Sequence, residues 1–326
     1  MAEDRVISRR QALRMGGAGL LLPFMDALPG SFIPLGNEPV IFGVIADLHH
    51  GLEPSAMERL EAFLQEAAER KADGIIQLGD FNYGTSESNE CMDLWNGFGG
   101  RRYHVLGNHD MDKTTKEQMV EYWQMPGRYY SFDLGGFHFV VLDRNNLKTP
   151  DGYVPYEHAN FYVDSAMRGH ANPEQLEWLR SDLESTRLPT VAFVHQGLGM
   201  QDEILPVDDA RGAIENVLRE AGRSDRRPGV VACFCGHHHL DRYNRKDRIH
   251  HVWINSISYY WVGEPYGRMA PYRDPLFAFI TFHPEGYIQV EGRKTTWESP
   301  SPLERGYPRA DELTPYISDR RLSRIR

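Results

Sequence analysis

Short apolar runs alternate with amphipathic stretches along the first part of the chain. Residues 40–46 are continuously apolar, and apolar positions then recur with helical spacing over residues 54–72. Two more short apolar runs follow at residues 75–78 and 103–106. Runs without polar alternation are typical of strands that are buried on both faces. The succession of strand, helix and strand therefore predicts an α/β domain with a mostly parallel central arrangement and helices outside it.

The second half of the chain continues this pattern with a hairpin and further strands. Two apolar runs flank Gly135 and Gly136, which predicts a β-hairpin with a two-residue turn. Residues 144–170 are polar, aromatic-rich and without periodicity, as in a long functional loop. Asn172 followed by Pro173 is typical of a helix start. Strands are expected at residues 190–194 and 230–235, a helix at 208–221, and two runs at 249–254 and 276–282 that extend a second sheet.

The N-terminal segment differs from the rest of the chain. Arg9 and Arg10 precede a short, weakly apolar stretch at residues 15–25, a pattern that resembles a twin-arginine export signal. The stretch is too short for a stable membrane span. A disordered basic tail is the alternative. We expect residues 1–37 to be signal and linker, with transient binding to the twin-arginine export machinery and a periplasmic or secreted location.

The C-terminal segment also departs from the central pattern. From about residue 293 the chain is rich in Pro, Arg and Ser and has no periodicity. This composition predicts an extended tail on the surface over residues 293–326, and it leaves residues 38–292 as one domain.

Charge and cysteine content narrow the classes of partner. The net charge of −10 argues against binding to a nucleic-acid backbone, which requires a basic face. It does not exclude a small anionic substrate, because bound cations can supply local positive charge. Of the three cysteines, Cys233 and Cys235 lie within an apolar run and should face one side of a strand. We interpret them as small buried hydrophobic residues rather than as a disulfide or a metal-binding pair.

Residues that can bind metal ions are concentrated in five short segments. Each segment follows the end of an apolar run, where open α/β sheets place functional loops. The segments are Asp47-Leu48-His49, Gly79-Asp80, Gly107-Asn108-His109-Asp110, Val194-His195 and Gly236-His237-His238-His239. Each one is weakly or moderately specific alone, but the full set in this order points to a metal site.

The spacing and residue types indicate how such a site is built. In extended chain, residues i and i+2 point the same way, so Asp47 can face a metal together with His49 while the residue between them does not. The same spacing pairs His237 with His239. Two cations about 3.5–4 Å apart clamp both oxygens of a phosphoryl transfer, but they repel each other and need an anionic bridge. Mixed imidazole and oxygen donors suit iron, manganese or zinc better than calcium.

These segments resemble those of the calcineurin-like metallophosphoesterases, and the resemblance extends over about residues 40–292. It implies a four-layer α/β/β/α sandwich of two mixed sheets flanked by helices, with residues 38–292 as the catalytic domain. It also implies two metal ions and the hydrolysis of a small phosphorylated substrate by a metal-bridging hydroxide. The bond cleaved would be a phosphodiester, a phosphomonoester or a nucleotide pyrophosphate.

The resemblance also implies a division of the residues between the two ions and the catalytic groups. Asp80 would bridge, with Asp47, His49 and His239 completing one site and Asn108, His195 and His237 the other. His109 would stay off the metals and assist the leaving group as general acid, although a purely structural histidine is the alternative. Asp110 is the nearest candidate in sequence to orient it.

One position departs from the common family pattern. Tyr83 stands three residues after Asp80, where many members have an acidic residue, and the segment is similar to that of the purple acid phosphatases, whose tyrosine binds iron. Those enzymes have glycine where this chain has His49. Tyr83 is therefore a metal ligand, a hydrogen-bonded neighbour of the ligands, or a packing residue.

Substrate choice is less defined by the sequence. Aromatic residues are frequent at residues 153–162 and 253–266. They either stack a nucleobase or pack as core and lid. Arg268 and Arg273 either contact a phosphate or are solvated surface charges. Segments at residues 129–143 and 236–252 lean slightly toward the manganese-dependent ADP-ribose and CDP-alcohol diphosphatases, and they recur in cyclic-nucleotide phosphodiesterases. The alternatives to an enzyme are a non-catalytic metal-binding protein that retains the fold and a binding module unrelated to phosphate.

Overall fold

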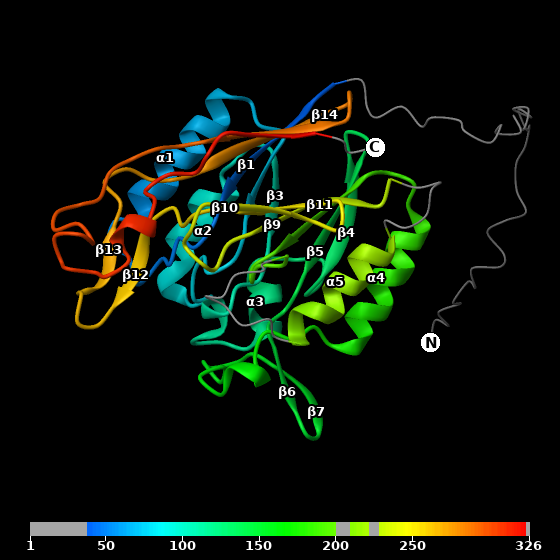
Figure 1. The fold of residues 1–326 in the computed structure, drawn as a ribbon, viewed down its shortest axis with the longest axis horizontal. Helices are drawn as coiled ribbons and strands as arrows, with labels where there is room; N and C mark the ends of the chain where they lie inside the picture. Colours follow the sequence, from blue (N-terminus) through cyan, green and yellow to red (C-terminus); the bar gives the residue numbers. More distant parts are fainter. Residues whose placement is uncertain (1–37, 200–208, 222–227, 324–326) are drawn as a thin grey trace, which may run out of the picture. The chain divides into compact units, whose positions relative to one another are not determined.

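The computed structural model describes residues 38–199, 209–221 and 228–323. The predicted export signal at residues 1–37 lies outside them. Within the described residues, two large mixed sheets and two small hairpins account for the strands (Figure 1). No helix of this part of the chain has the length and apolar character needed to cross a membrane.

The first large sheet combines a parallel and an antiparallel half. Its six described strands run in the order β16-β15-β14-β1-β2-β3, with β1, β2 and β3 parallel and the others antiparallel to their neighbours. Their bounds are β1 Val40–Ile45, β2 Gly74–Gln77, β3 Arg101–His104, β14 Ala278–His283, β15 Tyr287–Gly292 and β16 Arg320–Ser323.

The second large sheet has a parallel centre and antiparallel edges. Its six described strands run in the order β10-β11-β9-β8-β5-β4, and β5, β8, β9 and β11 are parallel. Their bounds are β4 Tyr130–Leu134, β5 Phe137–Leu142, β8 Thr190–Val194, β9 Val230–Cys235, β10 Arg242–Lys246 and β11 Ile249–Trp253.

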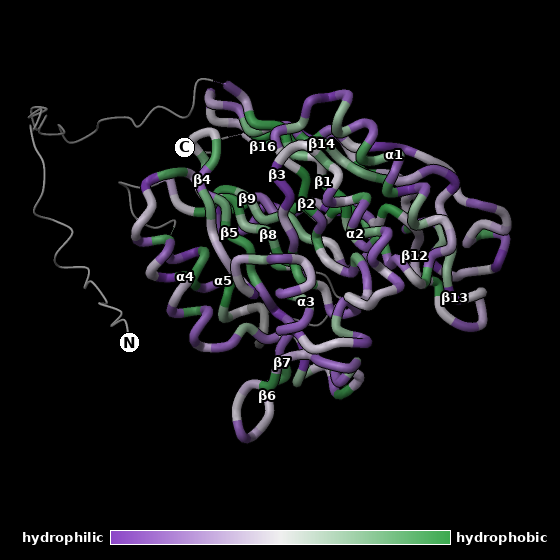
Figure 2. The backbone as a smooth tube through the Cα atoms, turned by 180° about the vertical axis from the view of Figure 1, so that it is seen from behind, coloured by the Kyte–Doolittle hydropathy of each residue, from purple (hydrophilic) through white to green (hydrophobic). Residues whose placement is uncertain are grey.

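The two sheets pack face to face through buried aromatic rings. Phe42 of the first sheet lies 5.2 Å from Phe139 of the second, and Phe139 lies 5.0 Å from Phe282, measured between ring centroids. All three side chains are fully buried. Burial of rings of this size is among the largest apolar contributions to stability. Figure 2 shows this concentration of hydrophobic residues along the strands.

Helices cover the outer faces of both sheets. On the first sheet, Phe63 of α1 packs against Phe277 and Phe279, and α2 adds Trp95. On the second sheet, Leu179 of α4 and Ile214 of α5 belong to a core cluster with the outer residues of the strands. The helix bounds are α1 Ala56–Glu69, α2 Asn89–Asn96, α3 Lys116–Tyr122, α4 Pro173–Ser185 and α5 Asp209–Ala221. The predicted four-layer α/β/β/α class is thus confirmed.

Most elements lie where the apolar pattern predicts them. The predicted hairpin is β4–β5, and Asn172 accepts the N–H of Gln175 with its side chain at the start of α4. The three cysteines are free and buried, as expected of small hydrophobic residues.

One prediction about the fold is wrong, and two are incomplete. The run at 276–282 extends the first sheet, because β14 pairs antiparallel with β1. The segment after Arg293 is not only a surface tail: it buries Ile317 and returns as the edge strand β16. The loop at 144–170 contains a hairpin, β6 Asn146–Thr149 with β7 Gly152–Pro155. Edge strands and small hairpins pack on few neighbours, so their sequences contain little periodicity.

Candidate metal centre

The five metal-binding segments follow the carboxyl ends of parallel strands in both sheets. Asp47 and Asp80 follow β1 and β2, whereas His195 and His237 follow β8 and β9. Backbone hydrogen bonds hold neighbouring loops together, because Asp47 donates its N–H to Gly79 O at 3.0 Å and His49 donates to Asp80 O at 2.9 Å. The sandwich therefore brings together side chains that are up to about 190 residues apart in sequence.

One group of donors consists of Asp47, His49 and His239. One ligand atom from each lies within 4.8 Å of the others, and all three side chains are buried. Nε2 of His49 and Nε2 of His239 are 3.2 Å apart, and Nε2 of His239 is 3.3 Å from Asp47 Oδ1. His239 donates its Nδ1 proton to Tyr259 O, which turns Nε2 toward the group.

A second group consists of Asp80, His195 and His237 with the same spacing. Nε2 of His195 lies 3.1 Å from Asp80 Oδ2 and 3.1 Å from His237 Nδ1. His195 donates its Nδ1 proton to Leu78 O at 2.7 Å, so this ring also turns Nε2 inward. Oδ2 of Asp80 is also 3.8 Å from His49 Nε2 of the first group. Asp80 thus lies between the groups, where a bridging carboxylate belongs.

Asn108 completes the predicted set. Its side chain is 6% exposed, and its Oδ1 atom is buried without a hydrogen-bond partner. Buried carbonyl oxygens without partners are rare, and each needs an explanation such as an ion. An amide oxygen is a suitable ligand for a hard or borderline divalent cation. The unsatisfied oxygen and the two imidazole–carboxylate groups together fit a pair of cations.

The backbone at the metal-binding residues has an unusual conformation. Five of the seven predicted ligands have positive φ angles: Asp47 at 55°, His49 at 51°, Asp80 at 53°, His237 at 68° and His239 at 50°. Non-glycine residues adopt this left-handed region infrequently, and such strain is concentrated at functional sites. The extended backbone predicted from the sequence is therefore wrong for Asp47 and His49 and for His237 and His239, whose side chains converge from left-handed backbone.

Glycines next to the ligands allow this close approach. A Cβ atom on Gly236 would lie 2.7 Å from Asp47 Oδ2, and one on Gly107 would collide with the backbone nitrogen of Asp80. Such separations are shorter than van der Waals contact. The glycine that precedes His237 and the one that precedes Asn108 are therefore required by the packing of the loops.

His109 lies beside the donors without belonging to either group. Its backbone N–H donates to Asp80 Oδ1 at 2.8 Å, and its ring centroid is 5.5 Å from that of His49. Its Nδ1 is 2.9 Å from Asp112 Oδ2, which leaves Nε2 free to face a ligand. Burial lowers the pKa of His109, but the charges of Asp80 and Asp112 outweigh it and raise the pKa above its ordinary value.

The contacts of Asp110 correct the interpretation that it orients His109. Its fully buried carboxylate accepts four backbone N–H groups, and Asp112 is the residue that holds the His109 ring. The donors are Phe81 at 2.7 Å, Gly107 at 2.7 Å, Asp80 at 3.0 Å and Asn82 at 3.2 Å. Asp110 therefore fastens the loop after β2 to the loop after β3.

The protonation of the donors depends on their burial and on Asp80. Burial lowers the pKa of His49 and that of His237 well below the ordinary value. Burial also opposes protonation of His195, but the Asp80 charge raises its pKa to about 9. Neutral imidazoles are the form that binds metal, and a cation between Asp80 and His195 would replace the shared proton.

Other predicted residues lie at the edge of the centre. The Tyr83 ring is half-buried, Lys113 Nζ lies 4.6 Å from its centroid, and burial together with Asp112 raises the pKa of its phenol to about 12. His238 stacks edge-on against His237 at 4.8 Å, and Leu48 is buried in the core. These two positions agree with the prediction that they are not ligands.

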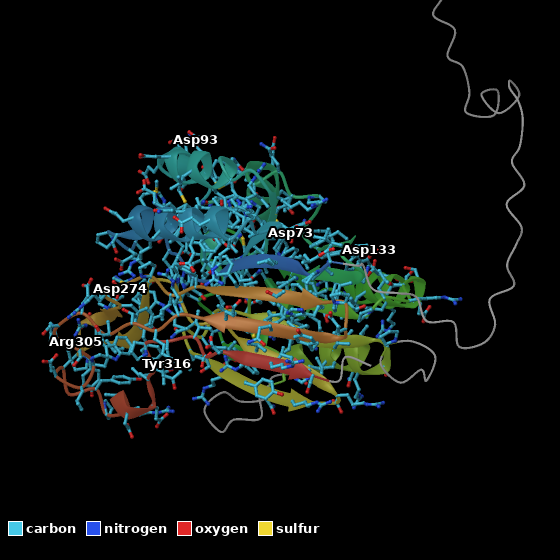
Figure 3. All side chains as sticks on the ribbon, turned by 90° about the horizontal axis from the view of Figure 1, so that it is seen from above. Asp73, Asp93, Asp133, Asp274, Arg305 and Tyr316 are labelled. Carbon is cyan, nitrogen blue, oxygen red and sulfur yellow. The ribbon has the colours of Figure 1, made fainter. Side chains whose placement is uncertain are left out.

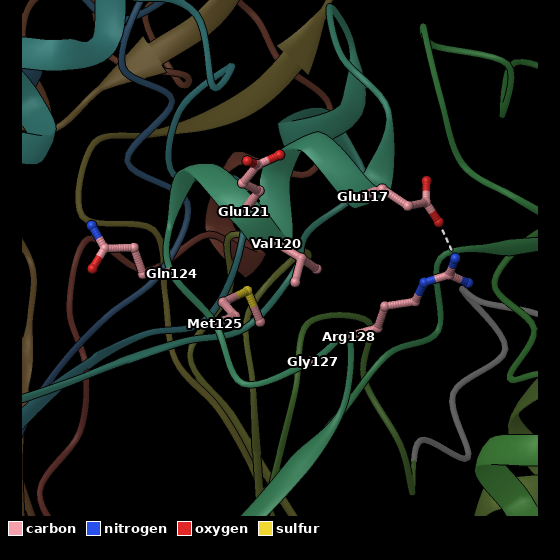
Figure 4. Close-up of a pocket in the computed structure, with 7 residues that line it drawn as sticks. All are labelled: Glu117, Val120, Glu121, Gln124, Met125, Gly127 and Arg128. Atoms are coloured by element: carbon pink, nitrogen blue, oxygen red, sulfur yellow. Dashed lines mark hydrogen bonds and ion pairs between the residues drawn. The ribbon is translucent and has the colours of Figure 1, made fainter. Parts of the chain in front are cut away.

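A surface pocket elsewhere contains none of the predicted site residues. It lies on α3 and the following turn, where Glu117 and Arg128 form an ion pair beside Val120 (Figure 4). The predicted site residues lie instead in the loops that follow the parallel strands.

Comparisons with known proteins agree with this fold. A model of the calcineurin-like phosphoesterase family matches residues 41–241, and no curated protein matches the chain. A dimetal phosphatase from Danio rerio superimposes with a TM-score of 0.60 and 15% identity, covering 89% of this chain and 99% of that one. GAP50, the anchor in the inner membrane complex of Plasmodium, gives 0.56 and 11%, covering 87% and 89%.

A third solved structure belongs to a larger protein. Purple acid phosphatase PPD1 from yellow lupin seeds gives a TM-score of 0.51 and 13% identity, covering 87% of this chain and 54% of that chain. At these identities the structures establish a shared fold. The architecture and the two donor groups define a phosphoesterase-type sandwich with a candidate two-metal centre. The family match extends over more than half of the residues, and the chain belongs to the calcineurin-like phosphoesterase family.

Proposed function

We propose that the protein hydrolyses small phosphoesters with two divalent cations bound at this centre. The main support is the position of Asp80, whose Oδ2 is 3.1 Å from one imidazole group and 3.8 Å from the other. One group would be Asp47, His49 and His239, the other Asn108, His195 and His237, with Asp80 shared. When bound, such a pair of cations supplies Lewis-acid polarisation of the phosphoryl group and an activated water.

The residues of the chain would position the substrate and move a proton. His109 has its Nδ1 held at 2.9 Å by Asp112, and the charges of Asp80 and Asp112 raise its pKa against the effect of burial, which stabilises the protonated form. In that state Nε2–H can donate to the oxygen of the departing alcohol. Protonation of a leaving group by a positioned side chain typically contributes 10²–10⁴-fold to the rate.

The proposal is tested by turnover of two aryl substrates. Metal-free protein is loaded with manganese, zinc or iron and incubated with p-nitrophenyl phosphate and with bis-p-nitrophenyl phosphate, and the release of nitrophenol is followed. We expect turnover of at least one substrate with at least one metal, and its loss in Asp80→Ala. Absence of turnover with every metal would contradict the proposal and favour a non-catalytic protein that binds metal. Diester turnover without monoester turnover would identify a phosphodiesterase.

We also propose export through the twin-arginine route to the periplasm or the medium. The support is the Arg9-Arg10 pair before a short apolar stretch. Fusion of residues 1–37 to a reporter that folds before export should place it outside the cytoplasm. Replacing both arginines by lysine should retain it inside, and export of the doubly substituted fusion would contradict the assignment.

A further inference from the structure

Two aromatic side chains lie beside the residues of the centre. The Trp261 ring centroid lies 5.9 Å from that of His49, edge-on, and 6.2 Å from that of His239. The Phe161 ring centroid lies 5.4 Å from that of His109, also edge-on. Trp261 belongs to the hairpin of β12 Tyr259–Gly263 with β13 Arg268–Pro271, and Phe161 lies in the segment after β7.

Arg268 lies over the Trp261 ring. Its guanidinium carbon is 5.5 Å from the centroid of that ring, at a distance typical of a cation–π contact. The same ring contacts two of the donor residues, so a single side chain connects the arginine to the centre. Arg268 is exposed, and it forms no ion pair with a carboxylate of the described residues.

The hairpin holds Arg268 in a constrained position. The residue has a φ of 61°, and the strand pairing shifts register between Trp261 and Gly263 opposite it. Arg305 of the C-terminal segment donates to Tyr266 O, within the turn, at 3.3 Å and to Met269 O of β13. Figure 3 shows Arg305 at the end of the molecule that contains this hairpin. Arg268 therefore lies next to a turn whose backbone is held by Arg305.

Tyr162, next to Phe161, is a second exposed side chain near the centre. It is 70% exposed, and its ring is 6.5 Å from that of His109. Burial and the charge of Asp112 raise the pKa of its phenol, while the charge of Arg268 lowers it.

We propose that Arg268 is a specificity-determining residue that binds a second anionic group of the substrate. The inference rests on the proposed function, in which one phosphoryl group is bound at the centre. The substrate class is then a phosphoester with a further phosphate or carboxylate, joined by a linker that passes along Trp261. In a chain with a net charge of −10, an exposed arginine that forms no ion pair with a carboxylate of the described residues offers such a group a charge-assisted hydrogen bond.

Binding of phosphonates that cannot be hydrolysed tests this inference without requiring turnover. Alkylphosphonates of increasing length are compared by calorimetry with carboxyalkylphosphonates of the same length, from propyl to heptyl, on manganese-loaded protein. We expect the wild type to bind the carboxylated compound about tenfold or more tightly at one length at least, as one charge-assisted contact allows. Arg268→Gln should remove this preference, and Arg268→Lys should keep part of it.

Arg273 provides the matched control. It is also exposed, and it lies beyond the far end of β13. Arg273→Gln should keep the full preference. The inference is overturned if the wild type shows no preference at any length, if the preference survives in Arg268→Gln, or if both variants lose it equally. Failure of the proposed function would appear separately, as absence of aryl phosphate turnover by wild-type protein.

Discussion

Asp110 and Asp112 lie two residues apart beside the centre, and they allow its construction to be tested separately from its chemistry. Asp110 accepts backbone N–H groups from the loops after β2 and β3, whereas Asp112 contacts the ring of His109. We expect Asp110→Ala to lower the free energy of unfolding strongly and Asp112→Ala to lower it little. Asp112→Ala should instead lower turnover.

The expected magnitudes follow from the contacts. Asp110→Ala leaves four buried N–H groups without their acceptor, and at ~1 kcal/mol each the loss is about 4 kcal/mol. That is a large part of the ~5–15 kcal/mol that stabilises a typical domain. The pair of His109 and Asp112 is partly exposed, at 25% and 21%, so its loss should cost below ~1 kcal/mol. Turnover of Asp112→Ala should fall about tenfold or more, because the His109 ring loses its orientation and the part of its pKa rise that Asp112 supplies beside Asp80.

Urea unfolding of the metal-free proteins, followed by circular dichroism, gives the stability of each variant. Metal content is measured by mass spectrometry, and turnover is measured on the same preparations. If Asp110→Ala loses less than about 1 kcal/mol, its carboxylate does not fasten the two loops. If Asp112→Ala is as destabilised as Asp110→Ala, or retains full turnover, the division of roles between the two aspartates is wrong.

Three further outcomes are expected. Asp80→Ala should lose stoichiometric binding of two cations, measured by mass spectrometry, since it removes the shared carboxylate; retention of both would exclude the bridge. His109→Gln should keep both cations and lose 10²–10⁴-fold in turnover of an ester with a poor leaving group, and full activity would refute its role as acid. His138 lies 2.6 Å from Asp133 and 2.8 Å from Asp182, and these carboxylates raise its pKa against the effect of burial. The ion pairs of His138 should therefore stabilise the protein fully below pH ~6.5 and lose this effect as the pH rises through the folded pKa. The difference in unfolding free energy between wild type and His138→Gln should shrink at alkaline pH. A difference that does not change with pH would contradict the ion pairs.

The sequence predicts the loops that carry the donors because a short segment of chain is enough to define each strand and the loop after it. Each of the runs before Asp47, Asp80 and His195 is short and mostly apolar, so each defines a buried strand and the loop that follows it. Parallel strands place their carboxyl ends on one edge of the sheet. These two facts bring together the donors of each sheet, and the packing of the two sheets brings the two sets together.

What the sequence leaves open depends on long-range pairing or on small differences in geometry. The apolar run of β14 suits either sheet, and only its pairing with β1 decides between them. The strand β16 is short and lies at an edge, where alternation is weak. Asp112 belongs to a 3₁₀ turn that starts at His109, and the tight turn, not sequence proximity, selects it over Asp110. The sequence signal for this contact is an aspartate three residues after the histidine, because a 3₁₀ turn brings residues with this spacing together.

The left-handed backbone of five predicted ligands indicates how the centre is assembled. Each such conformation costs on the order of 1–3 kcal/mol, so five of them persist only where the surroundings fix them. Those surroundings are visible: the N–H of Asp47 and that of His49 bond to the loop after β2, and the N–H of His237 bonds to the Asp47 carboxylate at 3.0 Å. These bonds join loops of both sheets. The packing of the sandwich therefore contributes to the placement of the donors.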